Sequence, residues 1–231
     1  MENDILEILE SMPINLKDKN ILYGKELDEF TLNELKEIYK CIERVADLIT
    51  SKLDGNLLPV SLNKFAELFD FKIYMDRIPD PAPIEGLKGD IVSILMRFED
   101  NIKRIIKIII VDENTKYNDE ITRLSIAFCI AQYILDIKED EYFSVSSFEN
   151  VQSLYPMSFY SGYFKNSLIE NIAYVLALNV LIPKSALNEI NKDVKSSQLS
   201  YDEKISLLAG FFGVRDYDIE KRLEYFDYTL Q

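Results

Sequence analysis

The sequence predicts an α+β fold that is mainly helical and contains a small three-stranded sheet with antiparallel strands. Apolar residues recur at helical spacing over several long segments. In contrast, residues 91–98 and 102–111 are rich in β-branched residues, and only the turn Glu99-Asp100-Asn101 separates them, which indicates a hairpin. A shorter run over residues 71–75 supplies the third expected strand.

The chain of 231 residues divides into three predicted units. Residues 1–54 form a helical N-terminal extension, in which Thr31 and Glu34 make a capping box that opens a long amphipathic helix. Residues 55–195 form the main domain, and residues 196–231 form a C-terminal helical unit.

The main domain is expected to begin with a short helix and to alternate helices with the three strands. Residues 77–89 are too rich in Pro and Gly to be anything but a loop. A polar and aromatic connection precedes the last long helix, which Pro183 ends. Helices are expected over residues 62–69, 118–137 and 166–181, and from about residue 185.

The C-terminal unit has the layout of a helix-turn-helix, because two amphipathic segments meet at Gly213-Val214-Arg215. A second helix that reads DNA should be basic. This one carries more acids than bases: Asp216, Asp218, Glu220 and Glu224 against Lys221 and Arg222. We therefore interpret the unit as a packing element.

Charge and composition restrict the function classes further. The net charge of −14 and the pI of about 4.5 disfavour direct binding to a phosphate backbone and are compatible with a basic protein partner. The chain contains no histidine, so Ser-His-Asp and Cys-His mechanisms and His-containing metal sites are excluded. A hydrolase built on this chain could use only carboxylates, Cys, Lys or Tyr.

The sequence predicts a cytoplasmic protein without a membrane segment. Its longest apolar runs, residues 105–111 and 172–183, are too short to span a bilayer. Its first residues are acidic, unlike a secretory signal. Two cysteines, Cys41 and Cys129, make no disulfide framework, so both thiols are expected to be reduced.

The segment RLSIAFCIAQYIL, residues 123–135, predicts a buried helix crossed by one polar stripe. Ser125, Cys129, Gln132 and Asp136 recur at i, i+4, i+7 and i+11, so they share one side of the helix. Several metallopeptidase families carry zinc ligands on a helix of this kind.

Four segments in order resemble the ImmA/IrrE family of zinc metallopeptidase-like proteins. LPVSLNKFAELFDFKIY is similar to the family's first helix and strand, and ENIAYVLALNVLIP to the helix after the active site. IIIVDENTKYNDEITRLSIAFCIAQYIL is similar to its strand, loop and active-site helix, and LAGFFGVRDYDIEKRLEYF to its closing helical segment. The resemblance implies a zincin-like scaffold.

This chain departs from the family at the His-Glu-x-x-His motif. Phe128 and Gln132 occupy the two histidine positions, Cys129 the glutamate position, and Glu170 the acidic third ligand position. The resemblance therefore implies a degenerate site without catalysis, metal or cofactor, because phenylalanine and a neutral amide bind zinc poorly or not at all. We expect Phe128 to fill the vacated volume, and Gln132 either to hydrogen-bond Glu170 or to meet solvent or a backbone carbonyl.

Three functions follow as expectations. The first is an inactive family member, encoded by a phage or mobile element, that binds a protein partner such as a repressor or a host defence protein. The second is an acidic inhibitor that mimics nucleic acid and blocks a host defence complex. The third is a metallopeptidase with a site rebuilt from Cys129, Asp136 and Glu170, although Cys129 and Asp136 lie about two helical turns apart.

Overall fold

A computed structural model describes residues 1–14, 29–53, 58–78, 90–100, 102–113, 119–135, 142–148, 158–160 and 168–225. The helices are α1 (Glu2–Glu10), α3 (Leu32–Lys52), α4 (Leu62–Glu67), α5 (Asp119–Leu135), α6 (Leu168–Leu181), α7 (Lys184–Ser196), α8 (Tyr201–Phe212) and α9 (Asp216–Tyr225). The strands are β1 (Lys72–Asp76), β2 (Asp90–Glu99), β3 (Ile105–Asp112), β4 (Tyr142–Phe148) and β5 (Ser158–Tyr160). The predicted α+β class, mainly helical with one small sheet, is confirmed.

The sheet has the strand order β1-β3-β2-β4-β5. The three predicted strands are present: β2 and β3 form the expected antiparallel hairpin, and β1 pairs with β3 in parallel. In the turn of the hairpin, the Asp100 carboxylate accepts hydrogen bonds from the backbone N–H groups of Ile102 and Arg104, both at 2.9 Å. An Asp side chain that bonds nearby backbone groups is typical of a tight turn.

Strands β4 and β5 correct the sequence prediction, which placed a polar connection in this part of the chain and counted only three strands. The segment of β4, YFSVSSF, combines three serines with three aromatic residues and a valine, and the aromatic residues and the valine are of the types enriched in strands, a signal that the prediction overlooked. Its backbone pairs with the second edge of β2, and β5 then pairs with β4. Residue type thus favours a strand here, and the long-range pairing decides where this strand lies in the sheet.

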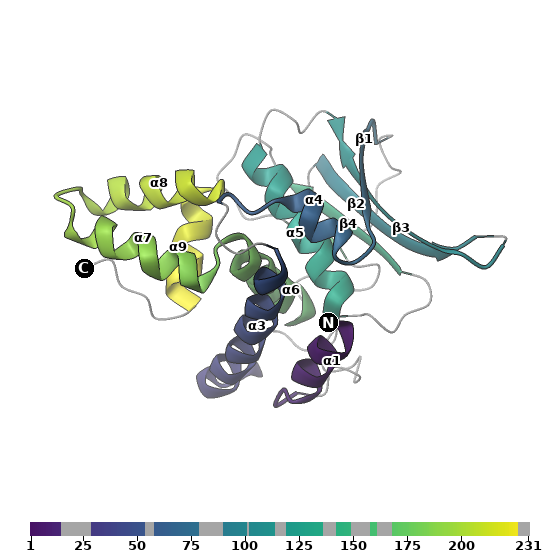
Figure 1. Ribbon diagram of the computed structural model, residues 1–231, viewed down its shortest axis with the longest axis horizontal. Helices are drawn as coiled ribbons and strands as arrows, with labels where there is room; N and C mark the ends of the chain where they lie inside the picture. Colours follow the sequence, from purple (N-terminus) through teal and green to yellow (C-terminus); the bar gives the residue numbers. More distant parts are fainter. Residues whose placement is uncertain are drawn as a thin grey trace.

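Helix α5 packs against one face of the sheet and against α6 on its other side, as Figure 1 shows. The sheet side chains that point toward α5 include Leu95 of β2 and Ile109 of β3, both fully buried. Helix α3 covers α6, and α1 packs on α3. The molecule therefore forms successive layers of sheet, α5, α6 and the N-terminal helices.

Two capping boxes determine where long helices begin. The predicted box at α3 is confirmed: Thr31 N donates to Glu34 Oε2 at 2.8 Å, and Glu34 N donates to Thr31 Oγ1 at 3.3 Å. Ser200 and Glu203 make the same reciprocal pair at the start of α8. Each pair satisfies two backbone groups that the first helical turn would leave without partners.

One cluster of buried apolar residues receives side chains from all three predicted units. Ile42 of the N-terminal segment, Phe128 of the central segment and Phe212 of the C-terminal segment are each 0% exposed within it. The division at residues 54 and 195 stays a prediction about the chain.

In the described residues, no single helix is long and apolar enough to cross a membrane, and α6 and α7 reach that length and hydropathy only as a pair bent by 63°.

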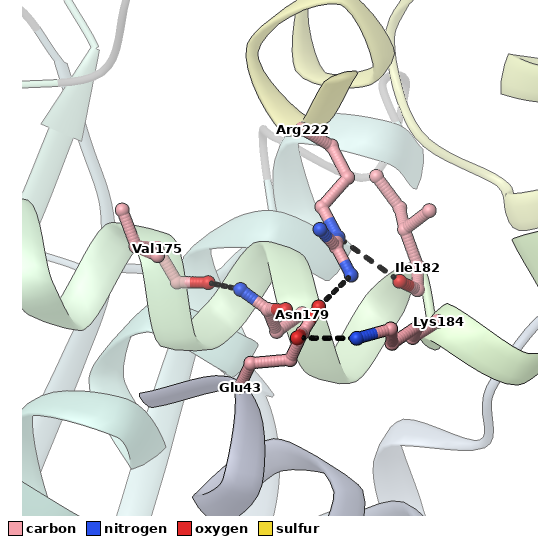
Figure 2. A network of polar contacts seen from close by, with 6 residues as sticks. All are labelled: Glu43, Val175, Asn179, Ile182, Lys184 and Arg222. Atoms are coloured by element: carbon pink, nitrogen blue, oxygen red, sulfur yellow. Dashed lines mark hydrogen bonds and ion pairs between the residues drawn. The ribbon is translucent and has the colours of Figure 1, made fainter. Parts of the chain in front are cut away.

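A buried arginine joins the two ends of the chain. Arg222 of α9 is 0% exposed, and it is the largest fully buried side chain in the described residues. Its Nη2 lies 3.4 Å from Glu43 Oε1 of α3, and its Nε donates to the carbonyl oxygen of Ile182 at 3.3 Å, just after α6 (Figure 2). Lys184 Nζ, at the start of α7, lies 2.7 Å from the other oxygen of Glu43.

The same cluster contains a second carboxylate, Asp47, one turn along α3 from Glu43. Burial and the Glu43 carboxylate raise the pKa of Asp47, while Lys184 and Arg222 oppose this increase. The two cations therefore offset two carboxylates at a boundary where Arg222 is buried and Asp47 and Lys184 meet solvent. Together these contacts hold α3, the junction of α6 and α7, and α9 in one arrangement.

The turn between α8 and α9 depends on Gly213, which has φ of 62° and ends α8 in the left-handed conformation. Arg123 of α5 donates from Nε to the Gly213 carbonyl oxygen at 3.0 Å and from Nη2 to the Val60 carbonyl oxygen at 2.9 Å. Burial lowers the pKa of Arg123, and Asp119 partly offsets that effect. This side chain thus connects α5 to the C-terminal helices.

We predict that Gly213→Ala destabilises the protein. A Cβ at this position would lie 3.1 Å from Arg123 Nε and 3.2 Å from Pro59 Cβ, in a backbone conformation that L-residues rarely adopt. The left-handed conformation alone should lower the free energy of unfolding by about 1–2 kcal/mol. Urea denaturation followed by circular dichroism measures the loss, and an unchanged midpoint would contradict this account of the turn.

A second prediction concerns the buried ion pair. Arg222→Met removes one partner and should lower the free energy of unfolding by about 1.5–3 kcal/mol, because Glu43, whose side chain is 12% exposed, keeps only Lys184 as its countercharge among the described residues. The double variant Glu43→Leu with Arg222→Met should be more stable than Arg222→Met alone, since Lys184 is 44% exposed and can remain hydrated. Additive losses in urea denaturation would show that the two side chains are not coupled.

Candidate functional site

Helix α5 contains the positions that the sequence analysis singled out, and it is buried along most of its length. Every residue from Leu124 to Leu135 is buried. A helix that is apolar around its whole circumference belongs in the interior, with other elements packed on several sides. Here the sheet lies on one side and α6 on another.

The first two residues of the polar stripe on α5, Ser125 and Cys129, face the sheet. Ser93 lies on the central strand β2 and is 0% exposed. Its hydroxyl oxygen makes a short hydrogen bond with the Ser125 hydroxyl and lies 3.2 Å from Cys129 Sγ. Ser125 and Cys129 are thus internal partners of the strand. Asp136, the last member of the predicted stripe, lies outside the described residues.

The four degenerate active-site positions all lie in the interior. Phe128 and Cys129 are 0% exposed, Gln132 is 1% exposed, and Glu170 is 7% exposed. The first three are on α5, and Glu170 is in the first turn of α6, where the helix dipole favours a negative charge. The two helices pack directly against each other. The predicted hydrogen bond between Gln132 and Glu170 is not formed: the Gln132 amide nitrogen, the donor that it requires, makes no hydrogen bond, and Glu170 Oε1 accepts none.

Sequence reasoning missed the strand residue that pairs with the stripe. Ser93 is a lone small polar residue within the apolar run IVSILM, and that interruption was the available signal. Lys107 is another polar residue within an apolar strand, β3, and its Nζ donates to the Phe69 carbonyl oxygen at 3.1 Å. The same ammonium group lies 4.9 Å from the centre of the Tyr133 ring of α5, a cation–π geometry.

The chemistry available at this place is limited. Cys129 is enclosed, so its thiol has no route to a substrate in the folded state. Within the residues that the structure describes, no three Cys, Asp or Glu side chains gather closely enough to hold a metal ion. The arrangement supports packing between the sheet, α5 and α6.

Comparisons with known proteins found one kind of similarity, to solved structures. No family model matches the chain, and no curated protein matches it. Among solved structures, the chain is similar to a Mycobacterium tuberculosis transcriptional regulator, with a TM-score of 0.43 and 15% sequence identity over 90% of this chain. The matched part is 51% of that protein, so this chain spans about half its length.

The burial of the cysteines leads to a labelling prediction. Cys129 is buried and Cys41 is partly exposed, so a thiol reagent such as DTNB should modify Cys41 first and Cys129 only after unfolding in urea. Absorbance at the wavelength of the released thiolate follows both phases. In Cys41→Ser the early phase should disappear, and two equally fast thiols in the native protein would contradict the enclosed position of Cys129.

The predicted bond between Gln132 and Glu170 can be tested by a double-mutant cycle. The structure implies no hydrogen-bond coupling between Gln132→Ala and Glu170→Ala, because the Gln132 amide nitrogen makes no hydrogen bond. If the bond forms in solution instead, the two substitutions together should lose about 1–2 kcal/mol less than the sum of the single losses, as a hydrogen bond to a charged group implies. Urea denaturation gives all four free energies of unfolding. Gln132→Ala combined with Glu37→Ala serves as the control, because the Glu37 side chain is 60% exposed and the two losses should add.

Proposed function

We propose that this protein is a catalytically inactive relative of the ImmA/IrrE family that acts by binding a protein partner. The observation that carries the proposal is the state of α5, the helix on which that family holds its zinc ligands. At the positions of the motif, α5 presents a buried Phe128, a buried Cys129 and a buried Gln132. The full chain contains no histidine to replace the missing ligands.

Two polar side chains of α5 support this proposal, because an internal partner on the sheet occupies them. Ser93 contacts both Ser125 and Cys129, which ties the helix to the sheet where a peptidase would need an open groove. A large aromatic side chain such as Phe128 contributes several kcal/mol to a core when it is buried. Selection for stability of the scaffold explains these residues without any catalytic role.

The partner is proposed from the resemblance and from the charge. Family members commonly act on regulators encoded beside them on phages and integrated elements, so a repressor or a host defence protein in the cytoplasm is the proposed target. A net charge of −14 favours association with a basic protein surface. The alternative, an acidic mimic of nucleic acid, draws on the same charge and would compete with DNA or RNA for its target.

The test begins with the metal content of freshly purified protein and then uses a reconstituted complex. We expect far less than one zinc ion per chain by elemental mass spectrometry. A partner captured from the host should form a stable complex with the purified chain and keep its intact mass after incubation with added zinc. Glu170→Gln is the matched control, because it retains the shape of the side chain and removes a carboxylate ligand.

Two results would refute the proposal. One is a stoichiometric metal ion that Glu170→Gln releases. The other is cleavage of the partner by the wild-type chain and not by Glu170→Gln, which would identify a rebuilt metallopeptidase. Displacement of the partner by DNA or RNA at physiological salt would favour the nucleic-acid mimic over a regulator-binding protein.

A further inference from the structure

Exposed apolar side chains concentrate on the C-terminal unit. Of the nine large apolar side chains that are exposed in the described residues, four lie between residues 199 and 211. Leu207 and Phe211 of α8 are 40% and 45% exposed, and their spacing of four residues places them next to each other on one face of the helix. Exposed apolar groups gathered in this way commonly mark an interaction surface.

Gly210 lies on the same face, between these two side chains in sequence. It is exposed, and a Cβ added to it would meet no atom within 4 Å. Unlike Gly213, Gly210 does not have a positive φ, so neither the backbone conformation nor the packing of this chain requires glycine there. Glycine lowers helix stability relative to alanine, and its common use is the close approach of another backbone.

The charges around this face have one predominant sign. Five acidic residues on α8 and α9 are exposed: Asp202, Glu203, Asp216, Glu220 and Glu224. Both helices are fully described, and none of their basic side chains is exposed: Lys204 and Lys221 are half-buried, and Arg222 is buried. Lys221 Nζ lies 2.6 Å from Glu224, so these two charges offset each other, and Asp202, Glu203, Asp216 and Glu220 give α8 and α9 their negative charge.

From these three observations we propose that the face of α8 formed by Leu207, Gly210 and Phe211 docks a basic amphipathic helix of the partner protein. The two apolar side chains would anchor the partner helix, and Gly210 would let its backbone approach α8 closely. Lys and Arg residues beside the partner's apolar face would meet the acids of α8 and α9. This inference rests on the proposed function and names the partner surface.

The same charges argue against a second copy of this chain as the occupant. A symmetric dimer places the same patch on both subunits, so the exposed acids of one α8–α9 unit would face those of the other. Like charges across an interface oppose association. A basic helix meets no such repulsion.

The experiment enriches helical peptides that bind the full-length protein. A phage-displayed library of 16-residue helical peptides is panned on the full chain and depleted on the double variant Leu207→Ser with Phe211→Ser. We expect enriched peptides to carry apolar residues at i and i+3 or i+4, flanked by Lys and Arg. Their affinity should fall roughly tenfold or more for Phe211→Ala, as for a central apolar anchor, and should weaken as salt increases.

Matched variants separate binding from folding. Gly210→Gln should weaken peptide binding by a similar factor and yet raise the urea midpoint, because glutamine is the better helix former. Leu32→Ala removes another exposed leucine, 68% exposed on α3, and should leave binding unchanged. Unaltered binding to both Phe211→Ala and Gly210→Gln overturns the proposal, as do acidic consensus peptides or a library without enrichment over the double variant.

Two further outcomes are distinguishable from failure of the proposed function. A wild-type dimer in analytical ultracentrifugation that Phe211→Ala abolishes would show a second copy on this face and would overturn the inference. An intact, captured partner that binds Phe211→Ala and Gly210→Gln as well as wild type would also overturn it while the proposed function stands. Cleavage of a partner whose binding does need Phe211 would refute only the proposed function.

Discussion

The buried guanidinium of Arg222 is the constraint on which the arrangement of helices depends. A charge that water does not reach needs a countercharge and hydrogen-bond acceptors in fixed positions, because burial without them costs several kcal/mol. Glu43 supplies the countercharge from 179 residues earlier in the chain, and Ile182 supplies a carbonyl oxygen. Helix α3, the junction of α6 and α7, and helix α9 must therefore assemble together. They share one cluster of buried apolar residues.

Helix α5 organises the other half of the molecule in a comparable way with neutral groups. Its serine and cysteine side chains bond to Ser93 of the sheet, and Arg123 at its start bonds the turn at Gly213. A helix enclosed on several sides contributes stability and precise placement of its neighbours, and it presents little surface to a ligand. Helix α8 differs from α5 in that one of its sides is open, with Leu207 and Phe211 exposed, and the proposed partner surface lies there.

Gly210 within α8 and Gly213 just after it have different structural roles although they are three positions apart. Gly213 is required by the conformation of the chain itself, since its φ is 62° and Arg123 and Pro59 lie close to it. Gly210 has open space beside it and an ordinary conformation, so nothing in the described part of the chain requires glycine there, and the proposed partner helix supplies a reason for it. A residue that weakens a helix without any internal benefit is informative about contacts that an isolated protein does not make.

The sequence by itself determined the local features: the capping box at Thr31, the hairpin at Asp100, the helix over residues 119–135 and the absence of histidine chemistry. These depend on groups within a few residues of one another, so spacing and residue type suffice. Only the tertiary structure decided that β4 pairs with β2, that Ser93 contacts Cys129 of the polar stripe, and that Arg222 pairs with Glu43. Those contacts join groups far apart in the chain, and no local preference specifies which distant partner a buried polar group or an open strand edge will meet.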